Sequence, residues 1–197
     1  MIETHLRNRV QPLFNTIGTR FAACHISANN ITLLALLTGL CAALCIATSH
    51  LKAALCLLML SGLFDMLDGT VARLNGTSHN FGAYCDLVAD RMVEAAVIIG
   101  FAWVYPEHIF AYLLFFAAVM LHFSTFVAAG ALFPNMGAKS MHYDASIVER
   151  AEAFMGFFAM LVWPHLIFEL LMLLNIIIFV AGITRFKRVM EYVHSTD

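Results

Sequence analysis

Residues 65–90 read DMLDGTVARLNGTSHNFGAYCDLVAD, a short segment that contains four aspartates. Asp65 and Asp68 are three residues apart in the sequence, and Asp86 and Asp90 are four residues apart. Residues at these spacings lie on one face of an α-helix. The segment therefore predicts two helices, each with a pair of carboxylates on one face, joined by a short polar link.

The four acids belong to a chain of 197 residues that is 61% hydrophobic and only 12% charged. A soluble domain of this size carries roughly twice that charged fraction, and the mean hydropathy here is +0.83. The apolar runs are continuous rather than alternating, which indicates membrane-spanning helices and not a β-barrel. The net charge of -2 gives no basic bias toward nucleic acid.

The apolar segments predict an all-α integral membrane protein with six transmembrane helices. Residues 1–27 mix apolar side chains with arginines, which favours an amphipathic helix on the membrane surface over a disordered basic tail. Residues 28–188 then form the six-helix domain, and residues 189–197 form a cytoplasmic tail. Three cysteines inside apolar runs, Cys41, Cys45 and Cys56, are interpreted as small core residues. The expected spans are approximately 30–48, 51–74, 82–105, 108–132, 149–163 and 167–183.

Positive charge is distributed unevenly among the predicted loops. The chain has 11 Lys and Arg residues, and with both termini in the cytoplasm only Lys52 falls on the outer side. By the positive-inside rule, this predicts that the acidic segment and both termini are cytoplasmic. The residues expected inside are Arg7, Arg9, Arg20, Arg73, Arg91, Lys139, Arg150, Arg185, Lys187 and Arg188.

Four acids in a membrane chain need a physical reason. Ionisable groups at membrane depth are costly and usually face a cavity, and neighbouring negative charges repel one another unless cations neutralise them. Magnesium binds carboxylate oxygens together with substrate phosphates, and no Cys or His pair has the spacing of a zinc site. We therefore expect a divalent-cation site. The alternative is that the acids cap helix ends or pair with Arg73 and Arg91 at the surface.

The acidic segment follows the pattern D-x2-D-G-x2-A-R-x8-G-x3-D-x3-D and matches every fixed position. This pattern resembles the signature of the CDP-alcohol phosphotransferase family. The resemblance implies transfer of a substituted phosphoryl group from a CDP-alcohol to a second alcohol, with release of CMP. It implies that Asp65, Asp68 and Asp86 hold one Mg²⁺, or Mn²⁺ in its place, and that Asp90 joins Asp65 and Asp86 around a second ion. It also implies that Asp90 is the general base that takes the acceptor's proton.

The resemblance extends to residues that would bind the nucleotide. Gly69, Ala72 and Gly82 would leave room for the CMP moiety against the helix backbones; close helix packing is the alternative. Arg73 resembles the family arginine that lies against the nucleotide's phosphates, and an anchor at the positive side of the membrane is its alternative.

A polar element precedes the first predicted span. Ser27 or Asn29 can cap that helix. The N-x-x-T element from Asn29 to Thr32 also resembles a turn that many family members have near the nucleotide, with Ala28 in place of the usual proline. Capping alone and nucleotide contact both account for these residues.

The acceptor alcohol is less well defined. Lys139 lies between the fourth and fifth spans, and Glu149 and Arg150 lie at the start of the fifth. These residues would suit a phosphorylated polyol such as glycerol 3-phosphate or inositol phosphate. The E-R-A-E run resembles an E-R-P-E-R element of bacterial phosphatidylinositol phosphate synthases, but Ala151 and Ala153 replace its proline and last arginine. A solvated charged loop is the alternative for Lys139.

The resemblance implies CDP-diacylglycerol as donor, a small alcohol as acceptor and a homodimer in membrane lipid. An aminoalcohol phosphotransferase, with a CDP-choline-type donor and diacylglycerol as acceptor, would carry the same motif. A cation transporter is a third hypothesis, but the sequence shows neither internal repeats nor interrupted mid-membrane helices. A chain without a targeting signal fits a bacterial or archaeal plasma membrane better than an organelle.

Overall fold

The computed structural model describes residues 17–19, 21, 27–76, 80–132 and 150–196, and every regular element among them is helical. This confirms the all-α prediction. The chain divides into two compact units, one within residues 2–107 and the other within residues 108–197.

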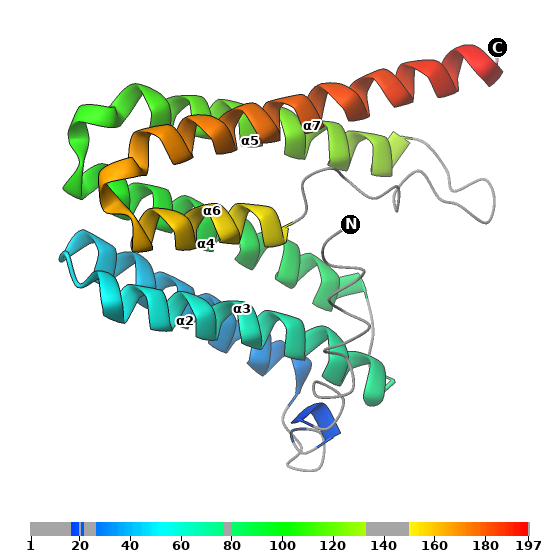
Figure 1. Ribbon diagram of the computed structural model, residues 1–197. Helices are drawn as coiled ribbons and strands as arrows, with labels where there is room; N and C mark the ends of the chain where they lie inside the picture. The colour runs from blue at the N-terminus through cyan, green and yellow to red at the C-terminus, as the bar shows by residue number, and fades with distance from the viewer. Residues whose placement is uncertain (1–16, 20, 22–26, 77–79, 133–149, 197) are drawn as a thin grey trace. The chain divides into compact units, whose positions relative to one another are not determined.

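The N-terminal unit contains α2 (Ala28–Ala47), α3 (Leu51–Leu74) and α4 (Asn80–Val104). α2 packs against both α3 and α4, and Figure 1 shows α2 and α3 as an antiparallel pair joined by a short turn. The hydroxyl of Ser27 accepts a hydrogen bond from the backbone nitrogen of Asn30 at 3.3 Å. Ser27 therefore caps α2, which confirms one of the two predicted caps.

Small residues allow α2 to approach α4 closely. A Cβ atom added at Gly39 would lie 2.5 Å from Cγ2 of Val93 on α4, and one added at Gly100 would lie 2.7 Å from the backbone oxygen of Ala43 on α2. Neither distance is compatible with a side chain at its present backbone position. This close contact determines the position of α4 along α2, and therefore the position of the acids on α4.

The 3-10 turn η1 (Pro106–His108) lies at the boundary between the two units. The C-terminal unit contains α5 (Ile109–Leu132), α6 (Arg150–Val162), the 3-10 turn η3 (Pro164–Leu166) and α7 (Ile167–Thr196). α7 packs against α5 and α6, and Figure 1 shows α5 and α7 side by side. The buried Asn175 of α7 donates a hydrogen bond to the backbone oxygen of Ala111 on α5 at 2.9 Å. α7 continues to Thr196, so most of the residues predicted as a tail extend the last helix.

Four helical segments of the described chain have the length and composition to cross a membrane: Ala28–Ala47, Leu51–Leu74, Pro106–Leu132 and Pro164–His194. The structure does not confirm the predicted number of six. α4 has 25 residues, but its first half carries several charged side chains. α6 has 13 residues, which make about 20 Å of helix against a hydrocarbon core of about 30 Å.

Most of the predicted surface helix, residues 1–27, lies outside the described residues. Within it, Ile17 and Phe21 pack against a cluster formed by Ile31, Leu67 and Val71. These two apolar positions therefore contact the protein itself, at the α2–α3 interface.

The interpretation of Cys41 and Cys56 as core residues is wrong, because both are exposed on helix surfaces. An apolar side chain on the outside of a membrane helix contacts lipid, which is as apolar as the protein core. Hydrophobicity alone therefore does not separate buried from lipid-facing positions in such a chain.

Candidate metal and nucleotide site

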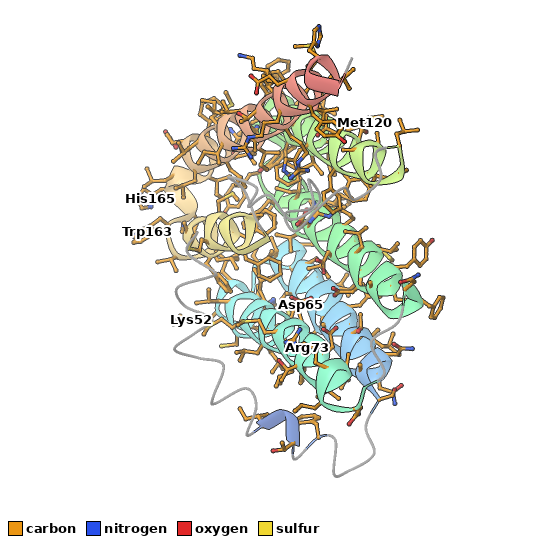
Figure 2. The ribbon with its side chains drawn as sticks, turned by 90° about the vertical axis from the view of Figure 1, so that its right-hand side faces the viewer. Lys52, Asp65, Arg73, Met120, Trp163 and His165 are labelled. Atoms are coloured by element: carbon orange, nitrogen blue, oxygen red, sulfur yellow. The ribbon has the colours of Figure 1, made fainter. Side chains whose placement is uncertain are left out.

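The last turns of α3 and the first turns of α4 bring acids from two helices together. Asp65 and Asp68 lie on α3, and Asp86 lies on α4. One carboxylate oxygen from each residue lies within 4.8 Å of the others. Figure 2 shows Lys52 at one end of α3, with Asp65 and Arg73 farther along the helix. The two acidic faces predicted from the sequence therefore meet.

The three carboxylates have the properties of a cation site. Asp68 is 5% exposed and the other two are half-buried, so water screens their mutual repulsion only in part. Oδ1 of Asp86 is buried and has no hydrogen-bond partner in the described part of the chain. Such an oxygen is costly unless something satisfies it. An all-oxygen donor set suits Mg²⁺ or Mn²⁺.

Asp90 lies one helical turn after Asp86 on α4 and is half-buried, outside the three-residue group. The next turn carries Glu94, which is 3% exposed and forms an ion pair with Arg91 at 2.6 Å. The sequence prediction missed Glu94. The four-residue spacing of Asp86, Asp90 and Glu94 was the signal that could have found it, because it places all three on one helix face.

A hydrogen bond between helices joins α2 to the acidic group. Oγ1 of Thr32 donates to Oδ2 of Asp68 at 2.6 Å. The hydroxyl of Thr32 faces the Asp68 carboxylate, and the predicted nucleotide contact of Thr32 stays a prediction. Thr32 and Asp68 are 36 positions apart on different helices, so no local spacing pairs them.

The surroundings of Gly69 leave room for a ligand. A Cβ atom at this position would meet only Nη1 of Arg73 among the described atoms, at an ordinary contact distance of 3.4 Å. Arg73 is exposed, and its Nη2 donates to Oγ1 of Thr70 at 3.2 Å. The other residues predicted to bind the nucleotide lie on the same three helices: Asn29 on α2, Ala72 on α3 and Gly82 on α4.

The structure does not describe the side chains of the residues predicted to bind the acceptor. Lys139 and Glu149 lie outside the described residues. Arg150 is the first residue of α6, but its side chain is not among those described. Acceptor binding by these three residues stays a prediction.

Sequence comparison gives matches over most of the chain. The CDP-alcohol phosphatidyltransferase family model matches residues 25–184. Phosphatidylinositol phosphate synthase of Corynebacterium glutamicum is 35% identical over 52% of this chain and 48% of its own length. The inner membrane protein YnjF of Escherichia coli is 28% identical over 80% of each chain. Several curated relatives, this synthase among them, are matched over about half of their own length.

Solved structures have a similar fold. Mycobacterium tuberculosis phosphatidylinositol phosphate synthase with CDP-DAG bound has a TM-score of 0.72 and 21% identity, covering 89% of this chain and 92% of that one. The same synthase in complex with manganese and citrate has a TM-score of 0.74 and 22% identity, covering 90% and 88%. At these identities the likeness shows the fold.

Proposed function

Because the chain belongs to the CDP-alcohol phosphatidyltransferase family, we propose that it transfers a phosphatidyl group from CDP-diacylglycerol to a small alcohol and releases CMP. The observation that carries this proposal is the group formed by Asp65, Asp68 and Asp86, together with the buried Asp86 oxygen that makes no hydrogen bond in the described chain. Structures of a similar fold contain manganese or CDP-DAG, which supports a divalent ion and this donor.

The acids have separate roles in the proposed reaction. Asp65, Asp68 and Asp86 would hold one divalent ion, and Asp90 would join Asp65 and Asp86 around a second. Bound ions would neutralise the diphosphate and stabilise the leaving CMP. Asp90 accepts the proton of the acceptor hydroxyl while the hydroxyl oxygen attacks the phosphorus that carries diacylglycerol. The bond from that phosphorus to CMP breaks at the same centre, and CMP leaves with the electron pair.

The nucleotide would lie along the ends of α2, α3 and α4. Arg73 is exposed at the end of α3, and its planar set of donors suits the donor's phosphates. Gly69, Ala72 and Gly82 would admit the CMP moiety because they lack bulk, and Asn29 would contact it from the first turn of α2.

We propose a phosphorylated polyol as the acceptor. Several relatives are named phosphatidylinositol phosphate synthases, which supports inositol phosphate. The substitutions at Ala151 and Ala153 keep glycerol 3-phosphate as a second candidate. Lys139, Glu149 and Arg150 are proposed to bind this substrate. A homodimer with its active site in the cytoplasm completes the proposal.

The test is CMP release by the purified chain with CDP-diacylglycerol, Mg²⁺ or Mn²⁺ and a panel of acceptors. The panel contains inositol phosphate, glycerol 3-phosphate, inositol and serine. We expect release with one phosphorylated acceptor and none after EDTA. Asp90→Asn should lower the rate by about 100- to 10,000-fold, as loss of a general base does.

A matched control is Glu191→Gln, which removes one carboxylate from an exposed position on α7 and should leave the rate unchanged. A second donor, CDP-choline with diacylglycerol, tests the aminoalcohol alternative. CMP release from that pair and from no pair with CDP-diacylglycerol would overturn the proposed donor.

A further inference from the structure

Thr32 of α2 makes a short hydrogen bond to an acid of α3. Its Oγ1 lies 2.6 Å from Oδ2 of Asp68, and the two residues are only 8% and 5% exposed. A hydroxyl that donates to an ionised carboxylate gives distances of about 2.5–2.7 Å. The contact has the length of a hydrogen bond to a charged acceptor and is shielded from solvent.

The Thr32 hydroxyl has a second possible acceptor. The backbone oxygen of Ala28, one turn earlier on α2, lies 3.1 Å from Oγ1. A hydroxyl carries one proton, and of its two contacts the one to Asp68 is the shorter. Threonine inside a helix commonly bonds back to its own helix; here the hydroxyl also lies within hydrogen-bond distance of a carboxylate on another helix.

The packing on either side of this bond holds the two helices in register. Ile31 precedes Thr32, Leu67 precedes Asp68, and both belong to one buried cluster with Val71. Ile31 is fully buried. The backbone on either side of the hydrogen bond is therefore held in place by packing between α2 and α3.

We propose that Thr32 is a positioning residue for the cation site: it holds the Asp68 carboxylate beside those of Asp65 and Asp86 before an ion binds. This inference rests on the proposed metal site. Without an ion the three like charges repel, and a carboxylate that is free to rotate would turn away. Thr32 opposes that rotation, so an ion meets a ligand set that is already arranged.

The proposal separates two roles for one residue. A nucleotide contact, as the sequence predicts for Thr32, would change the affinity for CMP and leave the affinity for the metal unchanged. A positioning role would change the affinity for the metal ion alone, in the absence of any nucleotide.

The experiment measures binding of Mn²⁺ alone to the purified full-length chain, by electron paramagnetic resonance of the free ion, without substrate. Thr32→Val removes the hydroxyl and keeps the shape, and we expect it to weaken Mn²⁺ binding by about 10- to 100-fold, as loss of a partner of a metal ligand does. Thr32→Ser keeps the hydroxyl and should bind within a few-fold of the unmodified chain.

Thr38→Val is the matched control, because Thr38 lies on the same helix and donates to its own helix at Leu34, 2.7 Å away. It should leave Mn²⁺ binding unchanged. Thermal unfolding in detergent shows whether Thr32→Val is folded. If it is not, Thr32→Ala, which removes the same hydroxyl and leaves a smaller side chain, replaces it.

Three results would overturn the inference: unchanged Mn²⁺ binding in the variants without the hydroxyl, equal losses in Thr32→Ser and Thr32→Val, or a loss confined to CMP binding. If the unmodified chain binds no Mn²⁺, both the proposed metal site and the proposed role of Thr32 are contradicted. If the unmodified chain binds Mn²⁺ and Thr32→Val binds it equally well, only the role of Thr32 fails.

Discussion

A substitution at Gly69 can distinguish the requirements of the fold from those of the proposed ligand. A Cβ atom there would be in ordinary contact with the flexible end of Arg73, so the fold tolerates alanine. Alanine in a helix is also favoured over glycine by about 1 kcal/mol. We predict that Gly69→Ala keeps or raises the thermal unfolding temperature and raises KM for CDP-diacylglycerol by about 10- to 200-fold, the cost of one methyl group in a closely fitted site.

Steady-state kinetics and thermal unfolding of the same preparation check the prediction, and Mn²⁺ binding without nucleotide should be unchanged. An unchanged KM would show that the CMP moiety does not approach the backbone at Gly69. A lowered unfolding temperature would show that the space beside Gly69 is filled.

Helical spacing in the sequence predicts which acids share a face, and the structure brings Asp65, Asp68 and Asp86 together as expected. The bond from Thr32 to Asp68 could not be predicted in this way. It depends on how α2 lies along α3, which long-range packing determines and no local spacing encodes. Periodicity thus predicts which residues share one face of a helix, whereas it does not predict which residues of another helix they contact.

The contact between α2 and α4 predicts that glycine to alanine destabilises the protein at Gly100, whereas the same change at Gly69 does not. A Cβ atom at Gly100 would lie 2.7 Å from the Ala43 oxygen, and backbone atoms cannot rotate away as the end of a side chain can. We predict that Gly100→Ala lowers the free energy of unfolding by about 1–3 kcal/mol, the usual cost of overpacking.

Thermal unfolding in one detergent compares Gly100→Ala directly with Gly69→Ala, which serves as its matched control. Because α4 carries Asp86, weaker Mn²⁺ binding should accompany the loss of stability. Equal unfolding temperatures for the two variants would mean that α2 and α4 do not meet as closely as the distance indicates.

The helices were predicted with different success for physical reasons. α3 begins at Leu51 and ends at Leu74, as the expected span does. α7 extends to Thr196, because the change from apolar to charged residues marks the membrane boundary and does not end a helix. The exposed Cys41 and Cys56 show the same limit: hydropathy reports contact with apolar surroundings, whether these are lipid or protein.

The orientation of the whole chain in the membrane is predicted from the distribution of its charges. Lys52 is at the start of α3, and Arg73 is near its end. The 24 residues of α3 make about 36 Å of helix, which exceeds the hydrocarbon thickness of about 30 Å. The acids lie at the same end of α3 as Arg73, so the positive-inside rule places the proposed site on the cytoplasmic side.

Single cysteines at the two ends of α3 test this orientation. In a chain whose 5 native cysteines are replaced by alanine or serine, Lys52→Cys and Asn75→Cys put a thiol at exposed positions beyond either end of the apolar run. A membrane-impermeant maleimide applied to intact cells should label Lys52→Cys and should label Asn75→Cys only after permeabilisation. The reverse pattern would put the acids on the outer side, away from a cytoplasmic supply of nucleotide. Labelling of both thiols from outside would mean that α3 does not cross the membrane, and it would contradict the span as well as the orientation.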